Sequence, residues 1–261
     1  MIKRELYMNR IRPFIGGELI KVMTGIRRSG KSVMLELIKE ELAEAGVAPS
    51  QMISINFEDM RYSHLQTATA LHDEIIKRAE GIEGKAYLFF DEIQEVEGWE
   101  KCVNSLRVAL DCDIYITGSN AKLLSGELAT YIGGRYVEFV IYPFSFAEFL
   151  ELYHTIAPSD SIQQCFQKYL LAGGMPYLAN LRYEEEPSRQ YLTDLFNSVQ
   201  LKDIVKRNKI RDIDLLERII AYMTANVGTV FSASSLAKFF KNEQRTVAAE
   251  TILNYVRYCC D

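Results

Sequence analysis

The chain has 261 residues, of which 48% are hydrophobic and 25% are charged, a composition typical of a globular protein with one large or two modest domains. No apolar run approaches the roughly 18 residues of a membrane-spanning helix, and the start, MIKRELYMNRIRPF, lacks the continuous apolar core of a signal peptide. The net charge of −5 divides into −8 over residues 1–200 and +3 over residues 201–261, so the basic excess of the C-terminal part falls well short of a nucleic-acid-binding signal.

A glycine-rich loop follows the first predicted strand. The run LIKVMT, residues 19–24, is short and apolar, as expected of a buried strand. Residues 25–32, GIRRSGKS, match the pattern G-x-x-x-x-G-K-[ST]. Residues 32–45 then place apolar side chains at mostly helical spacing, and Gly46 is expected to stop that helix. Strand, loop and helix in this order are the context that a phosphate-binding P-loop (Walker A motif) requires.

The residue types of this loop predict a nucleotide site. Gly25 and Gly30 let the backbone turn tightly and bring its N–H groups close to phosphate oxygens. Lys31 is expected to lie against the β- and γ-phosphates, and the Ser32 hydroxyl to bind Mg²⁺. The predicted nucleotide-binding residues are Gly25, Arg27, Arg28, Ser29, Gly30, Lys31, Ser32 and Val33. The side chains of Arg27 and Arg28 either meet phosphate or point outward. The alternative is a basic surface turn before an amphipathic helix.

An acidic pair ends the third predicted strand. Residues 51–59 alternate apolar and polar as a second strand would, and LHDEIIKRAEG is a helix. The apolar strand within KAYLFFDEIQEV, residues 85–96, then ends in Asp91 and Glu92. Parallel strands present their carboxyl ends at the ligand edge of a sheet. We therefore predict a Walker B motif, in which Asp91 holds Mg²⁺ through its water shell and Glu92 polarises the attacking water.

The next predicted strand offers a further polar tip. Its apolar core lies within DIYITGSNAKLLSG, residues 113–126, and ends at Thr117 and Gly118. Asn120 or Ser119 is a candidate to orient water between Glu92 and the γ-phosphate. Either residue also suits the N-cap of a helix, so a catalytic and a structural role both remain open.

An arginine precedes the last predicted strand. Arg135 follows two glycines within LATYIGGRYVEFVIYPF, residues 128–144. An arginine near the γ-phosphate, from the same chain or from a neighbour, stabilises charge in the transition state. The alternative is an ordinary solvated arginine.

These segments together resemble a known family. GIRRSGKS, LFFDEIQ, ITGSNAKLLS, GGRYVEFVIYPFSFAEF and YLLAGGMPYL occur in the order seen in prokaryotic AAA+-type ATPases that carry a C-terminal domain of unknown function with winged-helix character. The resemblance implies a five-stranded parallel core, a helical lid and a winged helix. It also implies ATP rather than GTP, in agreement with the absence of an N-K-x-D guanine-reading motif from the sequence.

The predicted fold is an α/β P-loop NTPase sheet with helices on both faces, followed by an all-α lid and a winged-helix-like domain. The expected domains are residues 1–142, 143–208 and 209–261. The first lid helix is predicted at FSFAEFLELYHT. A second is predicted at SIQQCFQKYLLAGGMPYLANL and is broken by Gly173, Gly174 and Pro176. The AGGMP stretch is either a lid hinge or simply a helix stop and turn. A long amphipathic helix is then expected over 187–208, with a basic end at Lys202, Lys206 and Arg207.

Three further helices are expected at DIDLLERIIAYMTANVG, SASSLAKFFKN and TVAAETILNYVRYC, with Ser232 or Ser234 as a cap of the second. Their order resembles helix-turn-helix geometry. Lys238, Lys241 and Arg245 would attract phosphate, whereas Glu243 and Glu250 would repel it. Packing against another protein is therefore the competing use of this domain. The chain ends at YVRYCCD, where the family continues, so we expect this sequence to be a fragment of a longer protein.

Cysteine and histidine usage argues against a disulfide framework and against a histidine metal site. The five cysteines are odd in number and form no C-x-x-C, which predicts free thiols in a reducing cytoplasm. The histidines His64, His72 and His154 are scattered without metal-ligand spacing.

The predicted function is Mg²⁺-dependent binding and hydrolysis of ATP, coupled to movement of the lid and the C-terminal domain. The alternative is a nucleotide-gated DNA- or protein-binding module with negligible turnover. The presence of Glu92 favours hydrolysis, since a pure sensor has no need of a water-activating carboxylate, and the same residue disfavours a small-molecule kinase. The expected partners are ATP and a DNA or protein ligand of the C-terminal domain, with no membrane and with homo-oligomers as a further expectation.

Overall fold

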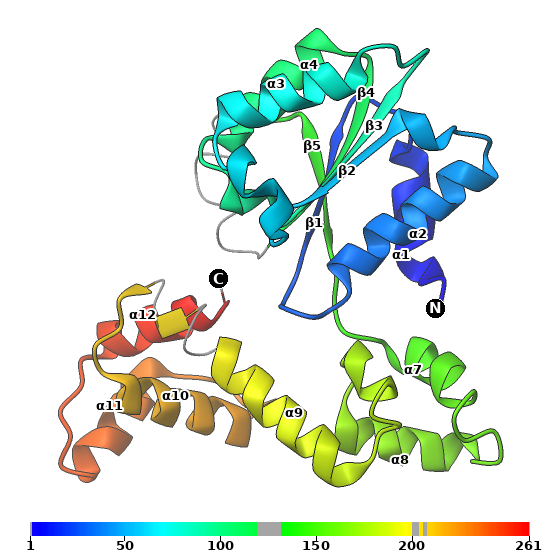
Figure 1. The fold of residues 1–261 in the computed structure, drawn as a ribbon. Helices are drawn as coiled ribbons and strands as arrows, with labels where there is room; N and C mark the ends of the chain where they lie inside the picture. Colours follow the sequence, from blue (N-terminus) through cyan, green and yellow to red (C-terminus); the bar gives the residue numbers. More distant parts are fainter. Residues whose placement is uncertain (1, 119–131, 200–203, 206–207, 261) are drawn as a thin grey trace. The chain divides into compact units, whose positions relative to one another are not determined.

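The computed structural model describes residues 2–118, 132–199, 204–205 and 208–260 (Figure 1). The chain divides into two compact units, Met1–Ser188 and Arg189–Asp261. The first unit contains the sheet and the two helices that the sequence assigns to a lid.

A five-stranded parallel sheet forms the first unit, with strand order β2-β3-β4-β1-β5. This confirms the predicted parallel α/β core. The strands are β1 (Ile20–Thr24), β2 (Met52–Asn56), β3 (Ala86–Asp91), β4 (Cys112–Thr117) and β5 (Tyr136–Val140).

Helices of the first unit are α1 (Glu5–Ile11), α2 (Lys31–Glu44), α3 (Ala68–Ala79), α4 (Trp99–Ala109), α7 (Phe146–Tyr153) and α8 (Ile162–Ala172). The helix α9 (Glu185–Ser198) spans the division between the units, and the second unit contains α10 (Ile213–Ala225), α11 (Ala233–Asn242) and α12 (Ala249–Cys260). Short 3-10 helices occupy Arg12–Phe14, Pro49–Gln51, Met60–Leu65, Ile93–Glu95 and Pro176–Ala179.

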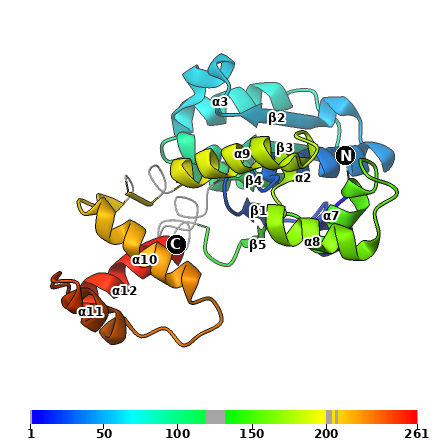
Figure 2. The same ribbon diagram turned by 90° about the horizontal axis from the view of Figure 1, so that it is seen from below.

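Helices cover both faces of the sheet (Figures 1 and 2). On one face, α3 and α4 pack through residues such as Ile75 and Leu106 into a core shared with Val22, Leu88 and Ile116. On the other face, α1 and α2 pack through a second set that includes Ile11, Met34 and Ile38. All five residues of β1 are buried, because a parallel strand covered on both faces has no solvent side. Polar groups that serve a ligand are therefore expected at the strand ends.

The carboxyl ends of the strands lie level with one another. Asn56 pairs in register with Asp91 across β2 and β3, and Met23 pairs with Thr117 across β1 and β4. The segments that follow β1, β2 and β3 therefore leave the sheet at one edge, and the one after β1 is the predicted P-loop.

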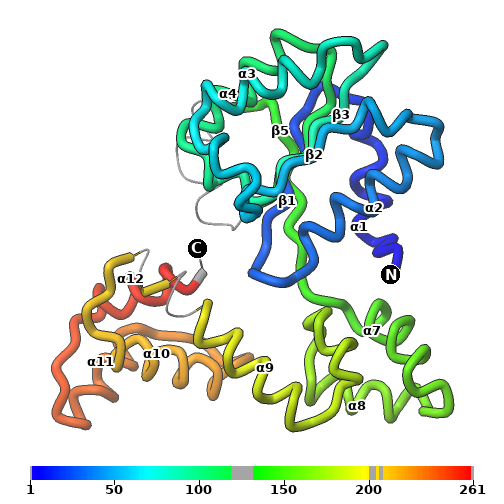
Figure 3. The backbone as a smooth tube through the Cα atoms, in the orientation of Figure 1, coloured from blue at the N-terminus to red at the C-terminus, as the bar shows by residue number. Residues whose placement is uncertain are grey.

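The chain leaves β5 and enters the helical pair α7 and α8 (Figure 3). A capping box formed by Ser145 and Glu148 begins α7, and Phe146 packs edge to face on Phe166 of α8. The helix α8 ends at Ala172 with Gly173 as its C-cap, in agreement with the predicted break at Gly173. A Cβ at Gly174 would lie 2.0 Å from the carbonyl oxygen of Phe144, and the Phe144 N–H donates to the Gly174 carbonyl at 2.7 Å. Only glycine fits there, so the AGGMP stretch fastens α8 to the segment that follows β5; its role as a hinge stays a prediction.

The second unit has a small core between α10, α11 and α12, formed by Leu215, Ile219, Ala233, Leu236, Phe240 and Ile252. The Ser232 side chain caps α11, as predicted, by accepting a hydrogen bond from the Ser235 N–H. Residues 208–260 contain helices and turns but no strand, so the winged-helix interpretation stays a prediction.

Two general features of the chain bear on its chemistry. Cys102, Cys112 and Cys165 are free thiols, and burial raises the pKa of the Cys102 thiol to about 12 and that of Cys112 to about 11. Among the residues that the structure describes, no helix has the length and apolar character needed to cross a membrane.

Candidate functional site

The predicted P-loop connects the end of β1 to the start of α2. Gly25 has φ 135° and is buried, and a Cβ there would lie 2.2 Å from the carbonyl oxygen of Ile141. Any side chain at this position would push the loop away from the segment after β5. Gly30, with φ 101°, is the N-cap of α2. The loop therefore meets the positive end of a 14-residue helix, the arrangement that favours an anion.

Lys31 lies inside this loop rather than on the surface. Its residue is 5% exposed, and its Nζ donates to the carbonyls of Gly25 at 3.1 Å and Ile26 at 3.2 Å. Ser29 is fully buried, and its Oγ has no hydrogen-bond partner among the described residues. A buried hydroxyl without a partner is costly, so the loop has unfilled polar capacity of the kind that a phosphate oxygen satisfies.

The remaining loop residues are more exposed. Ser32 and Val33 are exposed in the first turn of α2, Arg28 is exposed with φ 62°, and Arg27 is half-buried. The exposed Ser32 hydroxyl and the Asp91 carboxylate are the oxygen donors that suit Mg²⁺. Across the described ranges, no group of three or more His, Cys, Asp and Glu residues is placed to hold a metal ion. Mg²⁺ is usually bound by one or two carboxylates together with phosphate oxygens and water.

Asp91 is held firmly at the end of β3. It is 7% exposed; its Oδ2 accepts a hydrogen bond from Asn56 Nδ2 at 3.0 Å, and its Oδ1 accepts one from the Thr117 hydroxyl. Each carboxylate oxygen still has a second lone pair. The carboxylate is thus oriented by the ends of two neighbouring strands and keeps capacity for a further ligand.

Glu92 has a conformation that is uncommon for its residue type. Its φ is 55°, in the left-handed region, and its N–H donates to Thr117 Oγ1 at 3.0 Å. Gln94 Nε2 donates to its carboxylate. Burial raises the pKa of Glu92; the hydrogen bond from Gln94 and the charge of Lys31 act in the opposite direction, and the charge of Asp91 adds to the rise. Lys31 and Asp91 are therefore both close enough to Glu92 to act electrostatically on its carboxyl group.

Two contact residues of this site were missed by sequence reasoning. Asn56 and Thr117 both contact Asp91, and Thr117 also fixes the Glu92 backbone. Each is the last residue of its strand. The available sequence signal for both residues was a polar side chain at the end of an apolar strand. That signal was insufficient, because which strands lie beside β3 depends on the order of strands in the sheet.

Replacing Thr117 by Val tests this arrangement, because the change keeps the shape and removes the hydroxyl. We expect the free energy of unfolding to fall by about 1–3 kcal/mol, since Asp91 and the Glu92 N–H both lose a buried partner. Urea denaturation gives this value. The control is Thr155→Val, an exposed threonine that donates only to a nearby carbonyl, for which the loss should stay below about 0.5 kcal/mol. Equal losses in the two variants would contradict the assignment.

Ser119 and Asn120 lie outside the described residues, so their predicted role stays a prediction. Arg135 is described, and it lies at the opposite edge of the sheet. Its carbonyl accepts a hydrogen bond from the N–H of Ile20, the first residue of β1, and its Nη1 donates to Asn104 of α4. The P-loop begins beyond the other end of β1, about 13 Å along the strand. The structure therefore does not bring Arg135 to the P-loop of its own chain. Its predicted role, stabilising charge near the γ-phosphate, stays a prediction only for the nucleotide site of a neighbouring chain.

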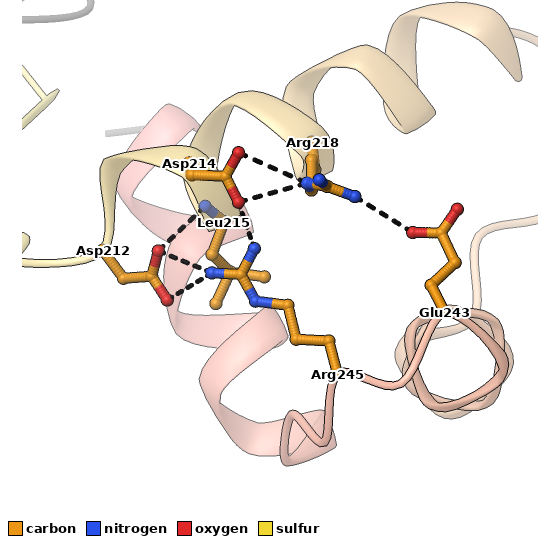
Figure 4. Close-up of polar contacts among 6 residues, drawn as sticks. All are labelled: Asp212, Asp214, Leu215, Arg218, Glu243 and Arg245. Carbon is orange, nitrogen blue, oxygen red and sulfur yellow. Dashed lines mark hydrogen bonds and ion pairs between the residues drawn. The ribbon is translucent and has the colours of Figure 1, made fainter.

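In the second unit, Arg245 belongs to an internal ion-pair network (Figure 4). Its Nη2 donates to both oxygens of Asp212, at 2.7 and 2.6 Å, and its Nη1 donates to Asp214. Arg218 in turn pairs with Asp214 and with Glu243, each at 3.1 Å. Hydrogen bonds from Arg245 lower the pKa values of both aspartates. The network fastens the start of α10 to the turn between α11 and α12, so Arg245 is engaged within the protein rather than presented to phosphate.

The exposed side chains of α11 and α12 that an external ligand could contact include basic, acidic and apolar groups. Lys238 and Lys241 are exposed on α11, whereas Glu250, Leu253 and Arg257 are exposed on α12. The last helix of the predicted helix-turn-helix arrangement, α12, thus presents one acidic, one apolar and one basic side chain.

Comparison with known proteins agrees with this geometry. Residues 18–150 match the model of the AAA domain family, and residues 163–261 match a domain of unknown function. An uncharacterized protein of Haemophilus influenzae is 38% identical over 257 residues, which cover 98% of this chain and 64% of that protein. An uncharacterized protein of Methanocaldococcus jannaschii is 32% identical over 254 residues, which cover 93% of this chain and 54% of that protein. The chain thus spans less than two thirds of the length of either relative.

Two solved structures to which the chain is similar are each 14% identical to it. One is a RuvB variant of Thermotoga maritima, with a TM-score of 0.46 over 95% of this chain and 82% of that one. The other is the Aeropyrum pernix ORC1 protein in complex with DNA, with a TM-score of 0.42 over 97% and 82%. The matched region, residues 18–150, contains the sheet, the P-loop and the acidic pair. The chain belongs to the AAA domain family and has the fold of an AAA+ P-loop ATPase.

Proposed function

We propose that this protein binds and hydrolyses ATP in a Mg²⁺-dependent reaction. The observation that carries the proposal is the convergence of Lys31, Asp91 and Glu92 at the carboxyl edge of one parallel sheet, where the charge of Lys31 acts on the Glu92 carboxyl. A P-loop alone is consistent with many phosphate-binding proteins. A water-activating carboxylate beside the metal-binding aspartate is needed only when water is the acceptor.

Each residue has a distinct role in this proposal. The backbone N–H groups of the P-loop, residues 25–33, bind the phosphates, and Lys31 neutralises β- and γ-phosphate charge. Ser32 and Asp91 hold Mg²⁺, which supplies further charge neutralisation when bound. Glu92 accepts a proton from the attacking water, and Ser119 or Asn120 orients that water. Arg135 acts only across an interface with a second copy of the chain.

Nucleotide state is proposed to act on the helices α7 and α8 and on the C-terminal unit. The Gly25 backbone lies against Ile141, and Gly174 lies against Phe144. The P-loop and the α8 end therefore contact the same short segment, residues 141–144. We place this cycle in the cytoplasm, which the free thiols support.

One observation favours the alternative, a nucleotide-gated binding module with slow turnover. The Glu92 carboxylate is engaged by Gln94, and burial raises its pKa. Both effects make the Glu92 carboxylate less available as a proton acceptor until the site rearranges. In this version the mixed character of the exposed α12 residues Glu250, Leu253 and Arg257 favours a protein over DNA as the partner.

Phosphate release from MgATP separates the two versions. Release should be followed over a range of protein concentrations, with and without duplex DNA, beside a calorimetric measurement of MgATP binding. Turnover per subunit that rises with concentration supports a hydrolase whose site is completed by a second copy. Tight binding without release supports the gated module. Absence of MgATP binding under all conditions would refute both.

The pH dependence of turnover should reflect the raised pKa of Glu92. A base must be ionised to accept a proton, and burial raises the Glu92 pKa above its usual 4.5. The acid limb of kcat is therefore expected at higher pH than for an ordinary glutamate, with activity rising as pH increases through the raised pKa. A pH–rate profile checks this. A limb at 4.5 or below would show that Glu92 does not limit the reaction.

A further inference from the structure

Arg4 is a charged side chain that is almost completely removed from solvent. The residue is 2% exposed and has φ 47°, a left-handed conformation that is uncommon outside glycine. Its guanidinium lies 4.6 Å from the ring centre of Tyr7 and 5.1 Å from that of Phe144. A buried arginine is tolerated only when its donors are satisfied, so the partners of Arg4 define what it does.

The first partner is the P-loop. Arg4 Nη1 donates to the carbonyl of Ser29 at 3.0 Å. In a trans peptide the carbonyl and the following N–H point in opposite directions. Holding the Ser29 carbonyl against Arg4 therefore directs the Gly30 N–H away from Arg4, and this N–H is among the groups proposed to bind phosphate.

The second partner is the beginning of α7. Arg4 Nε donates to Glu148 Oε1 at 2.8 Å, and the Glu148 Oε2 accepts from the N–H of Ser145 at 2.8 Å in the capping box. Burial alone would raise the pKa of Glu148, but the hydrogen bonds from Arg4 and Ser145 and the Arg4 charge outweigh it and lower the pKa. Glu148 is thus an ionised partner that joins Arg4 to the first turn of α7.

The third partner is the segment between β5 and α7. Arg4 Nη2 donates to the carbonyl of Tyr142 at 2.8 Å, and the Tyr142 N–H donates to the Tyr7 hydroxyl at 3.0 Å. The N-terminal segment therefore holds Tyr142 by both of its backbone groups. One guanidinium connects the P-loop, this segment and α7.

We propose that Arg4 is a positioning residue that couples the conformation of the P-loop to the orientation of α7. This inference rests on the proposed binding of ATP. Any movement of the Ser29 carbonyl when phosphate binds would leave a buried, charged N–H without an acceptor, unless Arg4 follows. Since Arg4 is also bonded to Glu148 and Tyr142, α7 and the segment before it must move with it. The penalty for a buried unpaired charge enforces the coupling.

The test compares nucleotide binding and α7 protection in four proteins. Wild type, Arg4→Met, Glu148→Gln and Arg12→Met are titrated with MgATP by calorimetry, and hydrogen exchange of residues 146–153 is measured with and without MgATP. Arg12 is the matched control, because it lies on the same N-terminal segment and pairs with Glu5 and with Glu41 of α2. Thermal unfolding checks that each variant is folded.

Arg4→Met is expected to raise the Kd for MgATP by about five-fold or more, the effect of losing a charged hydrogen bond that orients the loop. It should also abolish the MgATP-dependent change in exchange at α7. Glu148→Gln retains the Ser29 contact, so its Kd should stay within about two-fold of wild type while the α7 response is lost. Arg12→Met should match wild type in both measurements.

Three outcomes decide the matter. Wild type that binds no MgATP refutes the proposed function and with it this inference. If wild type binds MgATP, and a folded Arg4→Met variant binds it equally tightly and keeps the α7 response, the inference is overturned while the proposed function is not. If Arg4→Met does not fold, Glu148→Gln decides, and an unchanged α7 response in that variant overturns the coupling.

Discussion

Glu92→Gln is expected to reduce phosphate release from MgATP by about 10²–10⁴-fold, the usual contribution of a general base. Glutamine is nearly the same shape and can keep the hydrogen bond with Gln94, but it cannot accept a proton. The backbone of residue 92 is fixed by Thr117 and does not depend on the carboxylate. Binding of MgATP should therefore remain within about two-fold of wild type, as measured by calorimetry beside single-turnover phosphate release.

The control for this variant is Glu95→Gln, which changes an exposed glutamate three residues further on. It should leave both binding and release unchanged. Release at the wild-type rate in Glu92→Gln would contradict the role of Glu92. Loss of release together with loss of binding would mean that Glu92 holds the nucleotide site together rather than activating water.

The parts of the site that local sequence predicts are those built from consecutive residues. The P-loop lies between β1 and α2 as expected, and α2 ends at Glu44, just before the predicted stop at Gly46. Asp91 ends β3, also as expected. In each case the glycine, lysine or acid is next to the strand or helix that positions it, so chain connectivity alone fixes the geometry.

The parts that were missed depend on contacts between distant segments. Thr117 reaches Asp91 because β4 lies beside β3, and Arg4 reaches Ser29 and Glu148 across 25 and 144 residues of sequence. No local pattern carries that information. The helix α4, in contrast, has a local sequence signal. Its residues Trp99, Cys102, Val103 and Leu106 have helical spacing and are all buried, so the periodicity of apolar residues would have identified this helix. Arg135 directly precedes β5, and the start of a strand in a parallel sheet lies at the amino edge, away from the P-loop of the same chain; applied to Arg135, the predicted parallel topology would have excluded a role toward its own P-loop.

Asp113→Ala is expected to cause the largest loss of stability of any single change considered for this protein. Asp113, Lys21 and Tyr115 are all fully buried. Asp113 forms an ion pair with Lys21 and accepts hydrogen bonds from the Gly16 N–H at 2.6 Å and the Tyr115 hydroxyl at 2.7 Å. Removing the carboxylate leaves an unpaired buried ammonium group, which costs about 3–5 kcal/mol.

Urea denaturation of Asp113→Ala, with Asp111→Ala as control, measures this effect. Asp111 is two residues away and pairs with Lys85 at the surface, where an ion pair contributes about 0–1 kcal/mol. Burial lowers the pKa of Lys21, and Asp113 partly opposes this. Without Asp113 the folded-state pKa falls further below the unfolded value, so the unfolded chain binds more protons and stability rises with pH between the two values. Asp113→Ala should therefore recover stability more steeply than wild type as pH rises toward 10.5. A small, pH-independent loss would mean that Lys21 is neutral or hydrated in the folded protein.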